Sequence, residues 1–305
     1  MMKSVSLLAL LFTSCAGFSS APVTTVTLSK HVAAMPLARS KTSFSTHTTR
    51  TTTTTTVYAT NLDSDEQSEG GFLADVTFNP PYLVAYISFL LFAFFRTFTE
   101  EPGASNDILQ AFIADPLHPG CNEIFFAIFN LLGLYFIPMS CLLMPGSNNE
   151  NQKFPAAPFL IGSALGGYGL LGPYAFTRKP DPTLKTKSDL GWVTANILEN
   201  KIFNWFIVVA LVNAYLSSNV FSALAADASG TISGFGQLFS DTAIASASSM
   251  DFVILTIAAA SFIPEDLSRR GYKGESASLI AASTVLWPGV GVALYCALRP
   301  SLDEE

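Results

Sequence analysis

Six apolar stretches, most of them about as long as a membrane is thick, follow one another along the chain and restrict what it can fold into. They lie at about 82–98, 123–144, 157–176, 202–224, 251–264 and 278–298. A helix needs roughly 20 apolar residues to cross a bilayer. The stretches lack the alternating pattern of barrel strands, so helices are the expected form. The sequence therefore predicts an all-α membrane protein with about six transmembrane helices. The fifth stretch is the weakest, because Pro264 ends it early, and five helices remain without it.

The N-terminal region has the composition of a targeting sequence. Lys3 precedes a short apolar core at 5–12 and small residues at 14–17, which predicts a signal peptide over 1–18. Residues 19–61 are rich in Ser and Thr, carry scattered Lys and Arg and contain no acidic residue, which is typical of a transit peptide. This order resembles the two-part presequences of plastid proteins in algae with a plastid of red-algal origin. The alternative is a secretory leader followed by a Thr-rich stalk. We expect a plastid membrane, thylakoid or inner envelope.

The charge that follows the presequence excludes several classes of function. Residues 63–305 hold all 23 acidic residues but only 11 of the 16 Lys and Arg, a net charge near −12. Nucleic-acid binding is not expected, because it requires basic patches. After the presequence, one histidine, His118, and three cysteines without paired spacing remain, and they provide no metal site. Nucleotide-binding and hydrolase motifs are absent from the sequence. We therefore expect no cofactor other than a bound carotenoid or lipid, and membrane lipid, pigments or other plastid membrane proteins as partners.

Basic residues predict the orientation, because Lys and Arg in short loops stay on the side from which insertion occurs. Five lie between the third and fourth stretches, and three lie between the fifth and sixth. They are Arg178, Lys179, Lys185, Lys187 and Lys201, followed by Arg269, Arg270 and Lys273. Both loops should face the stroma. With six crossings, this pattern places both termini on the non-stromal side.

Weak self-similarity predicts two halves of three helices each. Asp115 and Asp241 recur at an offset of 126 residues, as do Pro138 and Pro264. An odd number of crossings in each half would make the two copies inverted repeats. The expected boundaries are a linker at 62–80, a first half at 81–180, a basic stromal loop at 181–200, a second half at 201–300 and an acidic tail at 301–305.

Two segments, one before the second apolar stretch and one before the fifth, are predicted to have different structures because they differ in glycine content. A short helix near 106–113, capped by Ser105 or Asn106, has an apolar face and is expected to lie along the membrane surface. Its counterpart at 230–241 contains three glycines. We expect a loop with one apolar turn there, because glycine disfavours a helix.

Polar side chains at membrane depth are the candidate functional residues, because burying them without a partner is costly. Asn130, Asn204 and Asn213 lie within stretches. They fit either hydrogen bonds between helices or contacts to the polar end of a lipid-like ligand. Asp251 and Glu123 open stretches and would sit at the interface near helix N-termini. If Asp251 instead faces the bundle, it is the candidate acid or base of any chemistry. A further charged group is expected to be a solvated stromal anchor, with ligand binding as the alternative. It comprises Glu265, Asp266, Arg269 and Arg270.

Several short motifs resemble two related membrane families. They are Leu238-Phe239-Ser240-Asp241, Asp251-Phe252, Glu265-Asp266-x-x-Arg269-Arg270-Gly271 and Pro288-Gly289-Val290-Gly291, with 122–145 similar to the opening segment of the same pattern. One family is bacterial and of unknown function, and the other is the plastid family that includes plant neoxanthin synthase. The resemblance covers about half of the mature chain and implies membrane-embedded isomerisation of a xanthophyll. Asp251 stands in the place of the plastid family's histidine, and Thr256 and Ser261 replace its Asp and Arg.

Three functions remain open at this point. The leading hypothesis is a non-catalytic accessory or assembly factor, or a protein that binds a carotenoid or another lipid. The second is a xanthophyll isomerase that uses Asp251 with Asn130 or Asn213. The third is a carrier of a small solute, which inverted repeats would favour.

Overall fold

The structure is a computed structural model that describes residues 78–147, 152–272, 274 and 276–303. Over these residues the chain is helical, and no strand is present. The long helices are α2 (Pro80–Thr99), α3 (Ala104–Ala114), α4 (Glu123–Leu143), α5 (Ala156–Thr177), α6 (Lys201–Ser217), α7 (Val220–Asp241), α8 (Ala243–Arg269), α9 (Ala277–Val285) and α10 (Val290–Leu298). Short helical turns are η1 (Met144–Gly146), η2 (Lys187–Asp189) and η3 (Thr194–Leu198). The predicted presequence lies outside the described residues.

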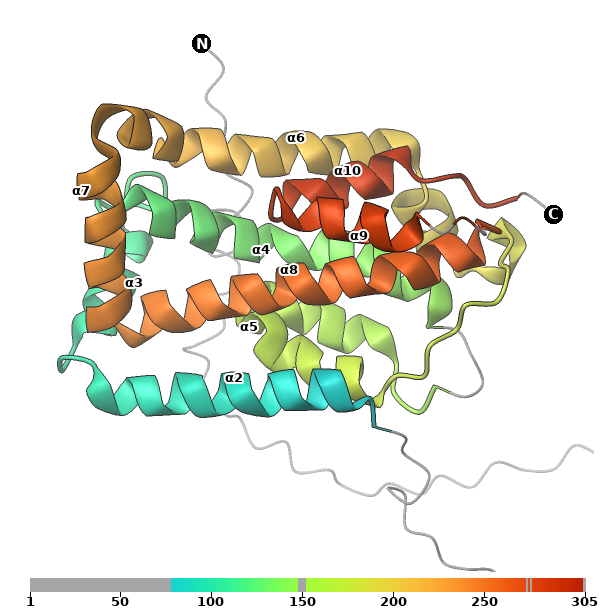
Figure 1. Ribbon diagram of the computed structural model, residues 1–305, viewed down its shortest axis with the longest axis horizontal. Helices are drawn as coiled ribbons and strands as arrows, with labels where there is room; N and C mark the ends of the chain where they lie inside the picture. The colour runs from blue at the N-terminus through green and yellow to red at the C-terminus, as the bar shows by residue number, and fades with distance from the viewer. Residues whose placement is uncertain (1–77, 148–151, 273, 275, 304–305) are drawn as a thin grey trace, which may run out of the picture.

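Four helices, α2, α4, α6 and α8, run along the length of the bundle (Figure 1). α2 runs opposite to α8, because its end bonds the start of α8 (Arg96 Nε to Ser246 Oγ, 3.0 Å) and Tyr82 near its start bonds Ser261 (2.7 Å). Three further contacts give the directions of α4 and α6. Phe125 clusters with Ala245, the carbonyl of Leu142 accepts from Arg269, and the Cys141 thiol donates to Asn204. α4 and α8 therefore share one direction, and α2 and α6 share the other.

α5 does not continue as one helix, because its backbone folds back at Gly166 and Gly167. Gly167 has φ +51° and ψ −136°, which is not helical. The rings of Phe159 and Tyr174 lie 5.9 Å apart, whereas 15 residues of straight helix would separate them by about 22 Å. Gln152 and Lys179, on either side of α5, also bond each other. The segment therefore forms a hairpin of two arms, 156–166 and 168–177, whose tip lies inside the bundle.

α9 and α10 form a second hairpin. Four residues, 286–289, separate two helices of nine residues each, and Gly289 has φ +77°. The Tyr215 hydroxyl donates to the carbonyl of Pro288 (3.0 Å). The tip of this hairpin therefore reaches α6 inside the bundle. Its two ends lie beside the C-terminal end of α8 (Figure 1).

The six membrane spans predicted from the sequence are not confirmed. By length and apolar character, α2, α4, α5 and α8 could cross a membrane, and α6 with α7, which are bent by 42°, would be a fifth span if taken together. The sixth predicted span is divided at Pro288 and Gly289, and α5 folds back although it is long enough. The fifth stretch was underestimated, because α8 continues through Pro264 to Arg269.

The direction of the helices also bears on the predicted repeat. Each half contains two helices that run the length of the bundle, α2 and α4 or α6 and α8, followed by a hairpin. The helices in equivalent positions run in the same direction, as the contacts above show. An inverted arrangement is therefore not confirmed, because a hairpin returns to the side on which it began and leaves an even number of crossings.

One end of the bundle, here called the acidic end, is covered by α3 and α7 (Figure 1). The predicted helix before the second stretch is present as α3, and its Phe112 packs on Phe125 and Phe126. The prediction of a loop at 230–241 was wrong, because α7 continues to Asp241. Apolar residues of α7, Phe235 and Leu238, pack against the same cluster. This packing outweighs the low helix propensity of its glycines.

The opposite end, here called the basic end, contains 178–201, 265–272 and 299–303. Eight of the ten Lys and Arg residues in the described part of the chain lie in these segments. Lys153 follows Gln152, which bonds Lys179 at the same end, and Arg96 lies at the acidic end. The amide of Lys187 donates to the carbonyl of Asp303 (2.9 Å), and the amide of Asn79 donates to that of Phe176 (2.7 Å). The beginning of α2 and the C-terminal residues therefore share one end with both basic loops. The sequence predicted the termini and the basic loops on opposite sides of the membrane, and this is not confirmed. Each of the two hairpins returns to the end at which it began, so neither adds a membrane crossing.

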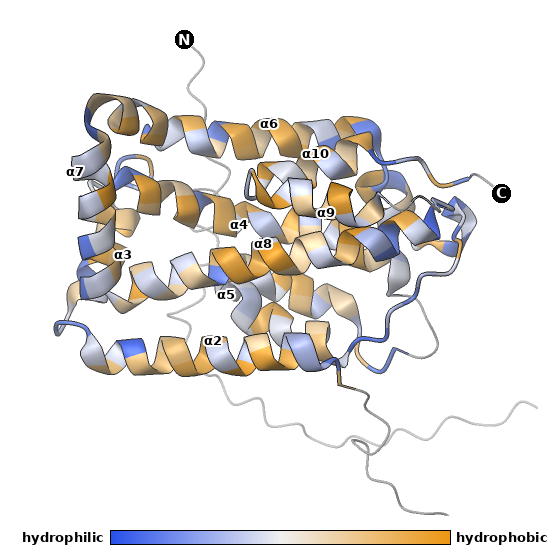
Figure 2. Ribbon diagram, in the orientation of Figure 1, coloured by the Kyte–Doolittle hydropathy of each residue, from blue (hydrophilic) through white to orange (hydrophobic). Residues whose placement is uncertain are grey.

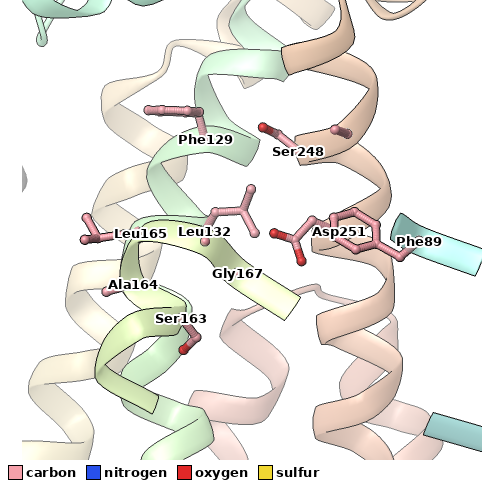
Figure 3. Close-up of a pocket in the computed structure, with 12 residues that line it drawn as sticks. Phe89, Phe129, Leu132, Ser163, Ala164, Leu165, Gly167, Ser248 and Asp251 are labelled. Carbon is pink, nitrogen blue, oxygen red and sulfur yellow. The ribbon is translucent and has the colours of Figure 1, made fainter. Parts of the chain in front are cut away.

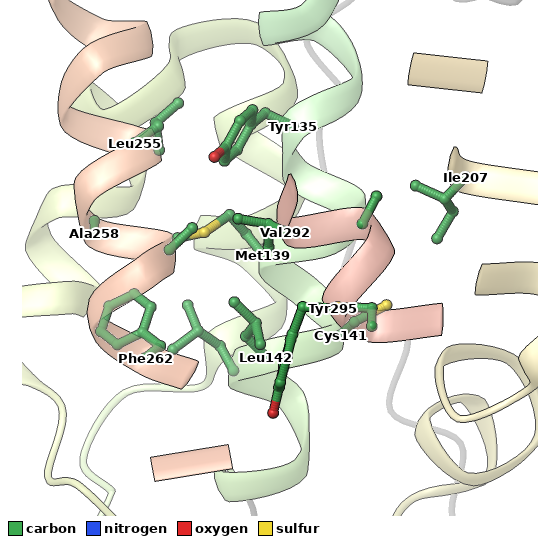
Figure 4. Close-up of a cluster of buried hydrophobic side chains, with 14 of the residues drawn as sticks. Tyr135, Met139, Cys141, Leu142, Ile207, Leu255, Ala258, Phe262, Val292 and Tyr295 are labelled. Carbon is green, nitrogen blue, oxygen red and sulfur yellow. The ribbon is translucent and has the colours of Figure 1, made fainter. Parts of the chain in front are cut away.

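The interior and the outer surface of the bundle are both apolar. The main core joins α4, α8 and α10 through residues such as Tyr135, Met139, Phe262 and Val292 (Figure 4). On α2, Phe89 is the one buried residue, while Phe94, Phe95 and other apolar side chains are exposed. Apolar colour accordingly extends along the sides of the bundle (Figure 2). An apolar belt of this size is unusual in water and is typical of contact with lipid.

Candidate functional site

A cavity of about 180 Å³ lies between the tip of the α5 hairpin and helices α2, α4 and α8 (Figure 3). Its lining residues are Phe89, Phe129, Leu132, Gly133, Ser163, Ala164, Leu165, Gly166, Gly167, Ala247, Ser248 and Asp251. Most of them are small or apolar, and Asp251 is the one ionisable residue in the lining. The cavity therefore combines a mostly apolar wall with one carboxyl group.

Asp251 is held inside the bundle by the hairpin. Its side chain is buried, with 7 % of the residue exposed, and its Oδ1 accepts a hydrogen bond of 2.6 Å from the backbone amide of Tyr168. That amide belongs to the N-terminal end of the second arm, where a helix favours negative charge. The predicted interfacial position of Asp251 was wrong, because α8 begins eight residues earlier, at Ala243. The carboxyl group instead faces the cavity (Figure 3).

Gly167 determines how closely the hairpin approaches this carboxyl group. A Cβ atom at position 167 would lie 1.6 Å from Asp251 Oδ2, which no side chain could tolerate. Its φ of +51° is also a conformation that residues with a side chain rarely adopt. Position 167 therefore requires glycine, both for the backbone conformation of the tip and for its close contact with α8.

Ser248 provides a second polar group, one turn before Asp251 on the same face of α8. The other serines and threonines of this helix donate their hydroxyl groups to carbonyls three or four residues earlier: Ser246, Ser249, Thr256, Ser261 and Ser268. The Ser248 hydroxyl has no such bond within the described chain and points toward the cavity (Figure 3). Its hydrogen-bonding capacity is therefore available to a ligand.

The amide candidates are not brought together with Asp251. Asn213 is exposed on the outer face of α6, and Asn130 is buried but is not among the residues that line the cavity. Asn204 bonds the Cys141 thiol and the carbonyl of Leu198 (3.0 Å), which is a structural role. Glu123 lies half-buried in the first turn of α4, as predicted for a helix N-terminus. The combination expected for an isomerase is therefore not assembled.

The predicted solvated anchor is instead a buried ionic cluster at the basic end. Asp266 is fully buried and accepts from Arg270 (3.0 Å), Arg299 (3.0 Å) and Tyr295 (2.7 Å). Both arginines also bond Glu199, at 2.9 and 2.8 Å. The prediction that this group is exposed to solvent was wrong. The charged partners come from α8, from the end of α10 and from the loop before α6, and they bury one another where these segments meet.

The neighbouring charges form a second part of this cluster. Glu265 bonds both Arg178 and Arg269. Arg269 also donates to the carbonyls of Leu142 (2.9 Å) and Asp181 (2.8 Å). Because the charged groups are engaged with one another, the candidates Glu265, Asp266 and Arg269 connect segments of the fold.

Neither Ser248 nor the glycines of α5 are among the candidate site residues predicted from the sequence. A signal was present, because Gly166-Gly167 and Pro288-Gly289 interrupt apolar stretches at corresponding places in the two halves, 122 residues apart. Paired interruptions of this kind point to binding sites in membrane carriers. Among the described residues, no group of three His, Cys, Asp or Glu side chains could hold a metal ion.

Comparison with known proteins found no match to the chain. No protein-family model matches the chain. No curated protein and no solved structure matches it either. The resemblance to the plastid family therefore stays a prediction, and the function has to be argued from the fold and the cavity.

Proposed function

We propose that the chain is a multi-pass membrane protein that carries a small polar solute, which binds in the cavity beside Asp251. The observation that supports this most strongly is the tip of the α5 hairpin, which ends at a buried carboxyl group. Broken helices that end near the middle of the membrane bind substrates and ions in carriers, because their free backbone groups and dipoles face the site. A carboxyl group inside a membrane protein is costly and is usually functional.

The size of the cavity supports a small solute. Sites for drug-sized ligands measure roughly 300–1,000 Å³, and an engineered cavity of about 150 Å³ accommodates benzene. The volume of about 180 Å³ therefore suits a molecule of a few heavy atoms, or one ring of a larger molecule. A whole carotenoid would exceed it several-fold.

Uptake by proteoliposomes tests this proposal. We expect vesicles that contain the protein to recover their volume faster than protein-free vesicles in at least one isosmotic solution of glycerol, glycine, betaine or sodium acetate. Ala247→Phe should abolish the difference, because residue 247 lines the cavity and the larger side chain fills it. Ala226→Phe, on the exposed face of α7, is the matched control and should retain uptake. Rates equal to those of protein-free vesicles in every solution would contradict the carrier.

A second candidate function is binding of a carotenoid or similar lipid, as an accessory protein of a plastid membrane. The aromatic and apolar lining supports it, with Asp251 accepting a hydrogen bond from a hydroxyl group on the end ring. Pigment or lipid that copurifies in a fixed ratio to the wild-type protein, and is lost in Ala247→Phe, would favour this candidate over the carrier.

We further propose a duplication in which the two halves have the same orientation, with the basic end in the stroma. Tyr174 and Arg178 then correspond to Tyr295 and Arg299, 121 residues later. The interruptions at the two hairpin tips, Gly166-Gly167 and Pro288-Gly289, lie at nearly the same offset of 122 residues. The acidic end, with α3 and α7, would face the other side of the membrane. This orientation follows the distribution of basic residues.

Labelling with a membrane-impermeant maleimide in sealed vesicles checks the orientation. We expect Lys185→Cys and Ser301→Cys to react from one side and Glu101→Cys from the other. Burial raises the pKa of Cys121 to about 11, so little of its thiol is ionised near neutral pH and its background reaction should be slow. Reaction of positions 185 and 301 from opposite sides would refute the arrangement.

A further inference from the structure

We propose that Asp251, Ser248 and the end of the first arm of α5 form a binding site for a monovalent cation, with Na⁺ as the ion. This inference deepens the carrier proposal, on which it rests, by naming an ion that the same cavity binds. It depends on two side-chain oxygens and the end of a helix arm, which line one cavity (Figure 3).

The first two donors are side chains on one face of α8. Asp251 uses Oδ1 to accept the Tyr168 amide, while Oδ2 has no hydrogen bond within the described chain. The Ser248 hydroxyl, three residues earlier, is also free of a bond to its own helix. One carboxyl oxygen and one hydroxyl oxygen, one helical turn apart on α8, are therefore available at the cavity.

The third donor is the backbone of the hairpin. The first arm ends at residue 166, and the last carbonyl groups of a helix have no partner within that helix. Ser163, Ala164 and Leu165 belong to this last turn and line the cavity. The C-terminal end of a helix is negative, so it attracts a cation. Carbonyls at the ends of broken helices bind Na⁺ or protons in carriers.

The charge of the ion follows from the number of carboxylates. Divalent cations such as Ca²⁺ take 6–8 oxygen ligands, usually with several carboxylates. One carboxylate lines this cavity, and among the described residues no group of three acidic, His or Cys side chains is placed to hold a metal ion. A monovalent ion would neutralise Asp251 without excess charge in an apolar surrounding.

The surrounding field favours cations as well. Asp251 lies eight residues into α8, about 12 Å from its start, and therefore nearer the acidic end. Seven carboxylates lie at that end: Glu100, Glu101, Asp107, Asp115, Glu123, Asp227 and Asp241. Arg96 is the single Lys or Arg there among the described residues. Such a field raises the local concentration of cations.

Thermal unfolding of the purified full-length protein in detergent tests the site, with NaCl compared against choline chloride at equal ionic strength. We expect Na⁺, but not choline, to raise the unfolding temperature with a saturable dependence on concentration. Asp251→Asn should abolish this effect. Ser248→Ala should weaken apparent Na⁺ affinity about fivefold to tenfold, as expected for one lost oxygen ligand.

Ser249→Ala is the matched control, because Ser249 is adjacent but bonds the carbonyl of Ala245. It should leave Na⁺ affinity unchanged, and this pair of variants remains decisive if Asp251→Asn fails to fold. Equal effects of Na⁺ and choline, or equal affinities in the two serine variants, would overturn the site. Saturable Na⁺ binding without solute uptake would instead overturn the carrier and retain the site.

Discussion

Replacing Asp266 by alanine is expected to lower the free energy of unfolding by about 3–5 kcal/mol, because two arginines lose a buried partner. Arg270 and Arg299 both bond this carboxylate, and all three side chains are at most 1 % exposed. Glu199 alone cannot compensate two guanidinium groups. In a domain of this size the loss corresponds to a fall of roughly 6–20 °C in unfolding temperature.

Thermal unfolding in detergent, followed by circular dichroism, measures this effect. Asp189→Ala is the control, because Asp189 lies at the same end of the bundle but is exposed and bonds Thr186 in its own turn. It should change the unfolding temperature little. If the two alanine variants unfold at the same temperature, the buried cluster does not stabilise the fold as argued.

Replacing Gly167 by alanine is expected to abolish cation binding and to lower stability by about 2–4 kcal/mol. The new methyl group would occupy the position of the Asp251 carboxylate, at 1.6 Å from Oδ2, so the side chain must leave the tip. Residue 167 would also be strained at φ +51°. Na⁺-dependent unfolding and solute uptake should therefore be lost together.

Two further variants separate these causes. Gly236→Ala, on α7, places a methyl group in open space, so it should leave Na⁺ binding intact and stabilise the helix by up to about 1 kcal/mol. The double variant Gly167→Ala with Asp251→Ala removes the clash and should be more stable than Gly167→Ala alone. A double variant no more stable than the single one would show that the carboxylate does not contact the hairpin.

The sequence allowed the helical class and most helix positions to be predicted, because apolar length determines what can lie in a membrane. It did not allow the path of the chain to be predicted. Gly166 and Gly167 fit close packing of a straight helix as well as a turn, and only Asp251, over 80 residues away, distinguishes the two. Whether α5 crosses the membrane or folds back decides on which side the chain continues, and so the predicted side of the termini depends on this contact.

The candidate site was predictable in part. Asp251 was identified as an acid that would matter if it faced the bundle, and it does so. Ser248 could not be selected, because its free hydroxyl group depends on side-chain rotation and not on residue type. The charged residues 265–270 were assigned to solvent, because their partners Arg178, Glu199 and Arg299 are distant in sequence.

The end of α4 has a consequence for biosynthesis. Its carbonyls at Cys141 and Leu142 accept hydrogen bonds from Arg299 and Arg269, which follow 158 and 127 residues later. When the first half enters the membrane ahead of the second, these guanidinium groups have not yet reached it. The nascent α4 therefore keeps its terminal carbonyls hydrated until the last helices arrive, and closure of the bundle is a step that follows insertion.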